Sequence, residues 1–136
     1  MLRRVLPIAL LAFTLHCAHD DPAERNLGLA NPASVHCGAV GGELRIETLG
    51  SRGEIGVCYF EDGRQCEEWA LFRGTCPVGG RRVTGLVTPG ARYCVIRGGR
   101  YAMTRPESGN TPEAGRCTLP DGTTCDTGAS EPEACP

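Results

Sequence analysis

Cysteine is the residue type with the most available chemistry in this 136-residue chain, which has nine of them. Eight fall into two groups of four, with gaps of 21, 8 and 10 residues in the first group and 23, 8 and 10 in the second. Their positions are 37, 58, 66 and 76, then 94, 117, 125 and 135. Cysteines in such a pattern can act as nucleophiles, bind a metal or pair as disulfides.

The spacing favours disulfides over the other two uses. Zinc sites use closely spaced pairs such as C-x2-C, and the chain has none. His36 beside Cys37 suggests a His–Cys nucleophile, but the equivalent Cys94 follows Tyr93, and a catalytic pair needs no repeated cysteine. We therefore expect disulfides, and we expect no metal, no cofactor and no catalytic residue.

Four carboxylates lie close together in the sequence, at Glu61, Asp62, Glu67 and Glu68. A catalytic pair of carboxylates needs a cleft and a fixed separation, which a domain of this size can hardly provide. The first turn of a helix favours acidic side chains because its free N–H groups carry partial positive charge. We therefore predict a solvated, acidic helix start, with contact to a cation or a basic partner as the alternative. We also predict that the protein is not an enzyme.

The cysteine spacing belongs to an internal repeat. At matching distances, a Gly-Gly pair follows the first cysteine of each group, Asp-Gly precedes the third, and proline follows the fourth. Self-similarity of this kind indicates two copies of one structural unit. It predicts a first repeat at residues 31–77, a linker at 78–90 and a second repeat at 91–136.

Hydrophobic periodicity and turn residues predict the elements of one repeat. Asn31 caps a helix at 32–40, strands follow at 43–48 and 55–60, and a capping box of Asp62 and Gln65 precedes a helix at 66–73. In the second repeat Gly128 and Pro132 disfavour the last helix, so a disulfide-tethered loop is expected there. The predicted fold class is α+β: two small disulfide-stapled helix–hairpin–helix repeats, the second with a degenerate C-terminal helix.

A repeat this small cannot bury enough apolar surface to be stable alone, and two disulfides would add about 2–4 kcal/mol each. Pairing within a repeat leaves three arrangements for each group of four cysteines. Of these we predict Cys37–Cys76, which would tie the two helices together, and Cys58–Cys66 across a turn. The same pattern would give Cys94–Cys135 and Cys117–Cys125.

The N-terminus is typical of an export signal. Two arginines precede an apolar run at residues 5–15, which is too short to span a membrane. We predict a signal peptide at residues 1–16, lipidation of Cys17 and a flexible tether at 17–30. Cleavage near Ala18 or Ala23, giving a secreted protein, is the alternative. The expected location is the periplasm or the outer face of the cell envelope, with the membrane contacted through the N-terminal lipid.

Two stretches of the first repeat resemble a small bacterial family, the domain of unknown function DUF333. They are NPASVHC at residues 31–37 and DGRQCEEWALFRG at residues 62–74, and the resemblance continues in the second repeat as far as Asp126. It implies an exported protein or lipoprotein that sometimes carries tandem copies, and it supplies no catalytic residues. Members often carry the name haemolysin, yet this sequence has neither an amphipathic membrane helix nor a long alternating hairpin.

These patterns favour a binding protein. The net charge of −2 gives no reason to expect nucleic acid as a partner. We predict a non-enzymatic module that binds an envelope protein or glycan, inhibitor-like in one version. The alternative is a structural envelope component without a specific ligand. The candidate partner contacts are Trp69, Phe72, Glu67 and Glu68. For Trp69 a place in the small core is the favoured interpretation, whereas exposure of Trp69 and Phe72 would favour binding.

Overall fold

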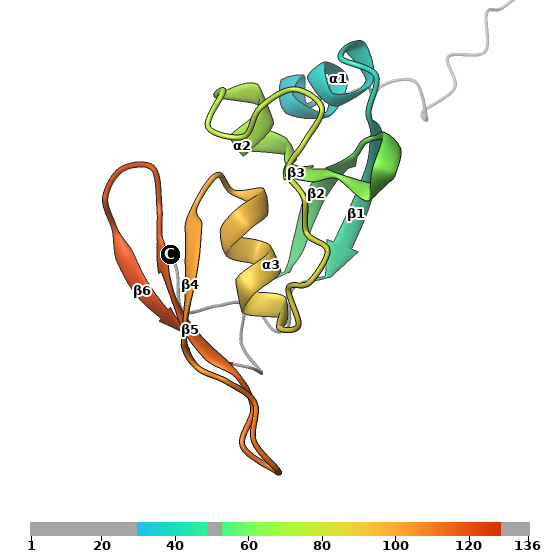
Figure 1. Cartoon of the computed structure of the whole chain (residues 1–136). Coiled ribbons are helices and arrows are strands. Elements are labelled where there is room, and N and C mark those ends of the chain that lie inside the picture. The colour runs from blue at the N-terminus through green and yellow to red at the C-terminus, as the bar shows by residue number, and fades with distance from the viewer. Residues whose placement is uncertain (1–29, 49–52, 129–136) are drawn as a thin grey trace, which may run out of the picture.

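Figure 1 shows the computed structural model, which describes residues 30–48 and 53–128. The predicted signal peptide, most of the tether, Cys17 and the C-terminal residues 129–136 with Cys135 lie outside the described residues. The first half of the chain contains α1 (Pro32–Ala39), β1 (Glu43–Thr48), β2 (Glu54–Tyr59), η2 (Glu61–Gly63), β3 (Gln65–Glu67) and α2 (Glu68–Phe72). The second half contains α3 (Pro89–Ile96), β4 (Arg100–Arg105), β5 (Ala114–Thr118) and β6 (Thr124–Thr127).

Each half begins with a helix that is followed by a three-stranded antiparallel sheet, in the order β1-β2-β3 and β4-β5-β6. The registers correspond, because Cys58 lies opposite Cys66 on the first sheet and Cys117 lies opposite Cys125 on the second. Helix α3 packs against β3 of the first sheet and against β4 and β5 of the second. It therefore lies between the two sheets (Figure 1).

The first helix forms as the sequence predicts. The side-chain oxygen of Asn31 accepts a hydrogen bond from the backbone N–H of Ala33 at 3.0 Å, and Pro32 occupies the first turn. Gly41 ends the helix in the left-handed conformation, with a φ of 85°.

The mixed α+β class is confirmed, but the order of elements within a repeat needs correction. A third strand, β3, takes residues at which the predicted helix 66–73 was to begin, and α2 is accordingly shorter. The cap of α2 is Glu67 rather than Asp62. In the second half, β6 replaces part of the predicted loop, and α3 begins at Pro89, inside the predicted linker. Backbone pairing with β2 and β5 outweighs the local helix and loop signals, because each added strand completes a sheet.

The predicted disulfide pairing is wrong. The structure joins Cys37 to Cys58, Cys66 to Cys76 and Cys94 to Cys117. Cys125 is also disulfide-bonded, with its partner outside the described residues. None of the predicted pairs Cys37–Cys76, Cys58–Cys66, Cys94–Cys135 and Cys117–Cys125 is compatible with these bonds.

The register of the sheet explains the observed pairing. Because Cys58 and Cys66 are directly opposite each other, their side chains leave the same face of the sheet. Helix α1, which carries Cys37, and the segment after α2, which carries Cys76, supply the partners on that face. The disulfides therefore fasten the helical layer to the sheet instead of linking one strand to the next.

The disulfides also form the core. All four cysteines of the first half are fully buried and pack with Ala70 and Leu71. A second cluster contains Cys94, Cys117 and Leu119. The Gly-Gly pairs fit this arrangement. A Cβ atom on Gly42 would lie 2.2 Å from the Cys58 sulfur, and one on Gly99 would lie 2.8 Å from the Cys94 sulfur. The second glycine of each pair thus lets the backbone pass directly over a disulfide.

A charged network joins the two halves. The guanidinium of Arg92, on α3, donates to both carboxylate oxygens of Glu47 on β1, at 2.7 and 2.9 Å. It also donates to Tyr59 Oη at 3.1 Å and to Gln65 Oε1 at 2.7 Å. Such a two-pronged arginine–carboxylate pair fixes orientation as well as distance.

The segment between the halves is bonded to both of them. Backbone groups of Arg81 pair with Gln65 at 3.0 and 2.9 Å, and the Arg81 guanidinium donates to the carbonyl of Gly99 at 2.7 Å. A Cβ atom on Gly98 would lie 2.3 Å from the carbonyl oxygen of Thr75, so the backbones of the two halves touch there. The two repeats therefore form one packed body.

Peptide mapping of the unreduced protein tests the pairing. We expect proteolysis followed by mass spectrometry to recover the cross-linked peptides Cys37–Cys58, Cys66–Cys76 and Cys94–Cys117, all of which disappear after reduction. Protein unfolded and oxidised at random serves as the control, because it gives mixed pairs. Recovery of Cys58–Cys66 from the native protein would contradict the observed disulfide pairing.

The Glu47–Arg92 pair makes stability depend on pH. Hydrogen bonding from Arg92 lowers the pKa of Glu47 below its ordinary value of 4.5. The pair therefore stabilises the fold above that pH, and this contribution is lost as the pH falls through the lowered pKa. We expect Glu47→Gln to reduce the free energy of unfolding at pH 7 by about 1–2 kcal/mol, discounted for partial exposure, and by much less near pH 2. Glu43→Gln, on the same strand but exposed, is the control. Equal losses at both pH values would contradict the assignment.

Candidate functional site

The two sequence stretches that carry the family resemblance meet at one buried carboxylate. Glu68, the first residue of α2, is 6% exposed. Its two oxygens accept hydrogen bonds from Asn31 Nδ2 at 3.0 Å and from Ser34 Oγ at 2.6 Å. Asn31 and Ser34 lie at the start of α1, so Glu68 fastens the beginning of α2 to the beginning of α1.

Gly56 makes room for this carboxylate on the sheet. A Cβ atom at Gly56, on β2, would lie 2.4 Å from the carboxyl carbon of Glu68. A side chain there would displace Glu68 from Asn31 and Ser34. The two helices and the sheet therefore meet at a site that admits only glycine on the strand side.

Glu67 holds the start of α2 from the other side. It is 8% exposed, and its oxygens accept hydrogen bonds from the backbone N–H groups of Trp69 at 2.9 Å and Ala70 at 2.8 Å. The predicted solvated acidic surface is therefore wrong, because only Glu61 and Asp62 of the four carboxylates are exposed. The carboxylates of Glu67 and Glu68 both accept hydrogen bonds from groups inside the protein. This argues against the prediction that either residue contacts a partner.

Once α2 is held in this way, it presents aromatic side chains to solvent. Trp69 is 37% exposed and Phe72 is 45% exposed, so the core interpretation of Trp69 is wrong. The two rings meet edge to face with centroids 5.8 Å apart, and the ring of His36 meets Phe72 in the same way at 5.7 Å. We call His36, Trp69 and Phe72 the aromatic face. The sequence pattern does not identify His36 as a member, because only the contact between α1 and α2 places it there.

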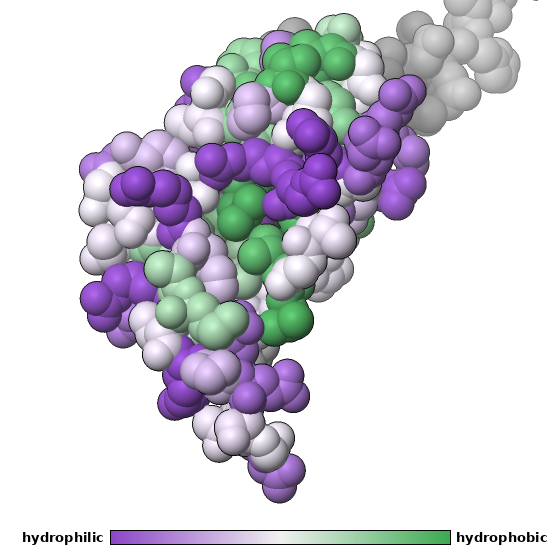
Figure 2. Space-filling view, in the orientation of Figure 1, coloured by the Kyte–Doolittle hydropathy of each residue, from purple (hydrophilic) through white to green (hydrophobic). Residues whose placement is uncertain are grey.

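Two further side chains border the aromatic face. The Arg73 guanidinium lies 6.0 Å from the centre of the Trp69 ring, within range of a cation–π interaction. Val35, the neighbour of His36 on α1, is 57% exposed. Apolar surface also gathers at the α1–α2 end of the molecule in Figure 2.

Within the described residues, the second repeat has no equivalent of this face. Gly128 takes the place of Trp69 in the repeat alignment, and β6 leads to it without a described helix. The space above the strand glycine is also filled differently in the two repeats. Glu68 lies over Gly56 in the first repeat, whereas the ring of Tyr101 lies over Gly115 in the second. The Tyr101 hydroxyl donates to the buried Glu113 at 2.7 Å. Candidate partner contacts are thus confined to the first repeat in the described part of the chain.

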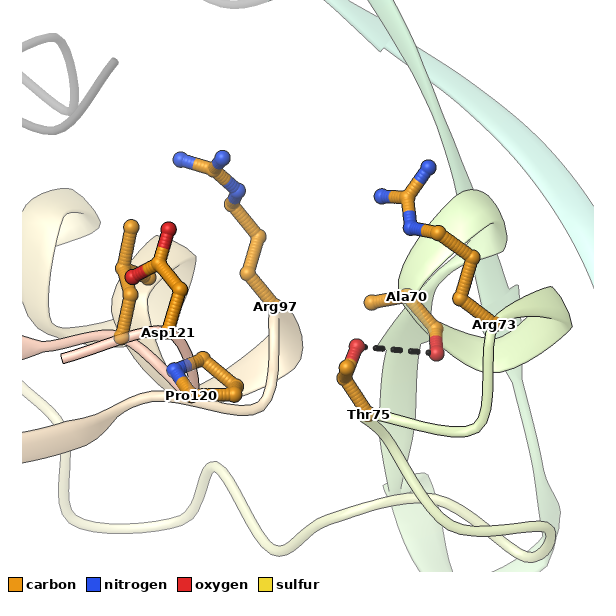
Figure 3. Close-up of a pocket in the computed structure, with 7 residues that line it drawn as sticks. Ala70, Arg73, Thr75, Arg97, Pro120 and Asp121 are labelled. Atoms are coloured by element: carbon orange, nitrogen blue, oxygen red, sulfur yellow. Dashed lines mark hydrogen bonds between the residues drawn. The ribbon is translucent and has the colours of Figure 1, made fainter. Parts of the chain in front are cut away.

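A small cleft of about 220 Å³ lies where the two halves meet. Ala70, Arg73 and Thr75 line it from the first half, and Arg97, Leu119, Pro120 and Asp121 from the second. Figure 3 shows Arg73 and Arg97 on opposite sides and the Thr75 hydroxyl donating to the carbonyl of Ala70, at 3.1 Å. Hydrogen bonds from Thr123 lower the pKa of Asp121, so this carboxylate stays charged. The cleft offers charges of both signs to a small polar molecule.

Within residues 30–48 and 53–128, no group of three or more His, Cys, Asp and Glu side chains comes together as a metal site. Cys37 is bonded to Cys58, so the proposed pairing of His36 with a reactive Cys37 is ruled out. In the same part of the chain, no helix is long and apolar enough to cross a membrane.

The sequence profile of the family described as "Domain of unknown function (DUF333)" matches residues 28–75 and again residues 85–129, once in each half. This chain belongs to the DUF333 family. The two matches agree with the tandem copies implied by the motifs. They also place the Asn31–Ser34–Glu68 network inside the first DUF333 copy.

The DUF333 chain is similar to curated bacterial proteins. It is 40% identical over 60 residues to the uncharacterized protein YoaF of Escherichia coli strain K12, an alignment that spans 44% of this chain and 70% of YoaF. YoaF proteins of Escherichia coli O6:H1 and of Shigella flexneri match to the same extent. No solved structure matches the chain.

The buried hydrogen-bond network predicts a large loss of stability when Glu68 is mutated. In Glu68→Ala the donors of Asn31 and Ser34 lose their acceptor inside the protein, and we expect the free energy of unfolding to fall by about 2–4 kcal/mol. Urea denaturation followed by circular dichroism measures it. The exposed Glu61→Ala is the matched control and should change stability by less than about 0.5 kcal/mol. Equal effects of the two variants would contradict the role of Glu68.

Proposed function

We propose that this DUF333 protein is an exported, lipid-anchored and non-enzymatic module that binds a partner protein of the cell envelope through the aromatic face. The disulfides support export, because such bonds form and persist in oxidising compartments. The predicted signal peptide supports a lipid on Cys17. The odd total of nine cysteines supports it too, because Cys17 lies outside the two groups of four that can pair as disulfides. A tether of polar residues would then hold the folded part away from the membrane.

The observation that carries the proposal is the exposure of Trp69 and Phe72. The chain contains only one Trp, three Tyr and three Phe, and two of these few side chains are exposed together on a five-residue helix. Tryptophan and arginine are over-represented among residues that dominate protein–protein binding, and Arg73 lies beside Trp69.

The aromatic face is also rigid, which favours binding. Helix α2 is fixed at its start by Glu67 and Glu68, and the Cys66–Cys76 disulfide closes the loop that contains it. A surface that is already ordered loses little conformational entropy when a partner binds. Such a framework also resists proteolysis, which suits an inhibitor-like version in which the partner is an enzyme.

Mutation of the aromatic face tests the function. In this experiment the full-length protein is expressed in its native host, with a photocrosslinking amino acid in place of Val35, which is exposed beside the aromatic face. We expect both the wild type and Met103→Ala to crosslink to one partner protein. The yield of this crosslinked product should fall at least about tenfold in Trp69→Ala/Phe72→Ala. Met103 is a suitable control because it is exposed to a similar extent on β4 of the other repeat.

The same experiment separates the alternatives. Crosslinking to polysaccharide that survives protease treatment would make the ligand a glycan and overturn the assignment to a protein. No crosslink at all would favour a structural envelope component without a specific ligand. A crosslink that persists in the double variant would show that another surface binds the partner.

A further inference from the structure

A second surface of the molecule carries an excess of positive charge. Four arginines line an open groove of about 560 Å³ at the junction of the repeats, together with Gly80, Val95, Gly99 and Tyr101. They are Arg64, Arg81, Arg82 and Arg100. None of the described residues that line this groove is acidic, although the whole chain has 16 acidic residues against 14 basic ones.

The four arginines differ in the contacts that their side chains make. The Arg81 guanidinium donates to the carbonyls of Gly99 at 2.7 Å and Val95 at 3.5 Å, which holds it in place. The other three are exposed, and their side chains make no hydrogen bond or ion pair within the described ranges. Elsewhere Arg45, Arg92 and Arg116 are each paired with a carboxylate. Arg64, Arg82 and Arg100 thus bring three arginines without a carboxylate partner in the described ranges to one surface.

The groove exists only because both repeats are present. Arg64 immediately precedes β3 in the first repeat, Arg81 and Arg82 follow that repeat, and Arg100 begins β4 in the second. The Gln65–Arg81 backbone pairing and the Arg81–Gly99 hydrogen bond hold these segments together. A single copy of the domain would supply only part of the lining.

We propose that this groove binds a ligand through its phosphate groups. Arginine presents a planar set of N–H donors that matches phosphate oxygens, and it keeps its charge at any physiological pH. Side chains of one sign around a hollow concentrate the electrostatic field and attract the opposite charge. Several arginines spread over a wide groove suit a ligand with more than one negative charge better than a single carboxylate. Phosphate on a lipid headgroup and phosphate on a soluble molecule share this chemistry.

Binding measurements with two probes test the proposal. The mature chain with Cys17→Ser, which carries no lipid, is titrated at low salt with inorganic pyrophosphate, and binding is followed by the NMR signals of the arginine Nε–H groups. The same protein is tested separately with phosphatidylglycerol vesicles in a sedimentation assay. We expect Arg64→Gln/Arg82→Gln/Arg100→Gln to bind at least about tenfold more weakly than the wild type. The control Arg45→Gln/Arg105→Gln/Arg116→Gln removes the same charge from exposed arginines outside the groove and should bind within about twofold of the wild type.

The outcomes decide the source of the phosphate. Groove-dependent binding of vesicles alone assigns a lipid headgroup, and groove-dependent binding of pyrophosphate alone assigns a soluble ligand. Equal weakening in both triple variants would mean non-specific attraction and overturn the proposal, as would the absence of binding to both probes. If the triple variant fails to fold, as judged by circular dichroism, Arg82→Gln and Arg100→Gln are measured singly. The test is independent of the aromatic face, because none of the substituted residues belongs to it.

Discussion

Every other feature of this protein depends on how its disulfides fasten helices to sheets. A chain with so few aromatic residues cannot bury much bulky apolar material, and its core is built largely from cystine. Cys37–Cys58 and Cys94–Cys117 occupy equivalent places in the two halves, each joining a helix to the middle strand of a sheet. Gly42 and Gly99 are needed where the backbone crosses these bonds. The constraint is steric as much as covalent, and it explains why a Gly-Gly pair follows the first cysteine at the same distance in both repeats.

Around this shared frame the two DUF333 copies have diverged in what they bury and what they expose. In the first copy Asn31, Ser34 and Glu68 form a closed hydrogen-bond network, and α2 then carries Trp69 and Phe72 outward. In the second copy those three positions are taken by Thr88, Ala91 and Thr127. The strand glycine there is Gly115, and it is covered by the ring of Tyr101, whose hydroxyl donates to Glu113. A network of buried polar groups is stable only when complete, so its members change together. The aromatic face is accordingly a feature of the first copy within the described residues.

The junction makes one body of the two copies. Arg92 reaches Glu47, Tyr59 and Gln65 across the interface, and Arg81 links the connecting segment to β3 and to Gly99. This packing creates surfaces that neither copy has alone, namely the cleft in Figure 3 and the arginine-lined groove. Tandem duplication thereby adds a cleft and a groove at the junction between the copies.

The sequence by itself determined the repeat, the disulfide-rich character, α1 with its Asn31 cap, the first two strands and the DUF333 family. These follow from spacing and from contacts between near neighbours, which a linear pattern records directly. Only the tertiary structure decided the disulfide pairing, the third strand, the burial of Glu67 and Glu68, and the exposure of Trp69. Each of these depends on which face of the sheet a helix covers. That is set by contacts between residues distant in sequence, such as the disulfide between Cys37 and Cys58, which are 21 residues apart. The helix pattern at residues 66–73 was locally sound, but the hydrogen bonds of a completed sheet outweigh one turn of helix.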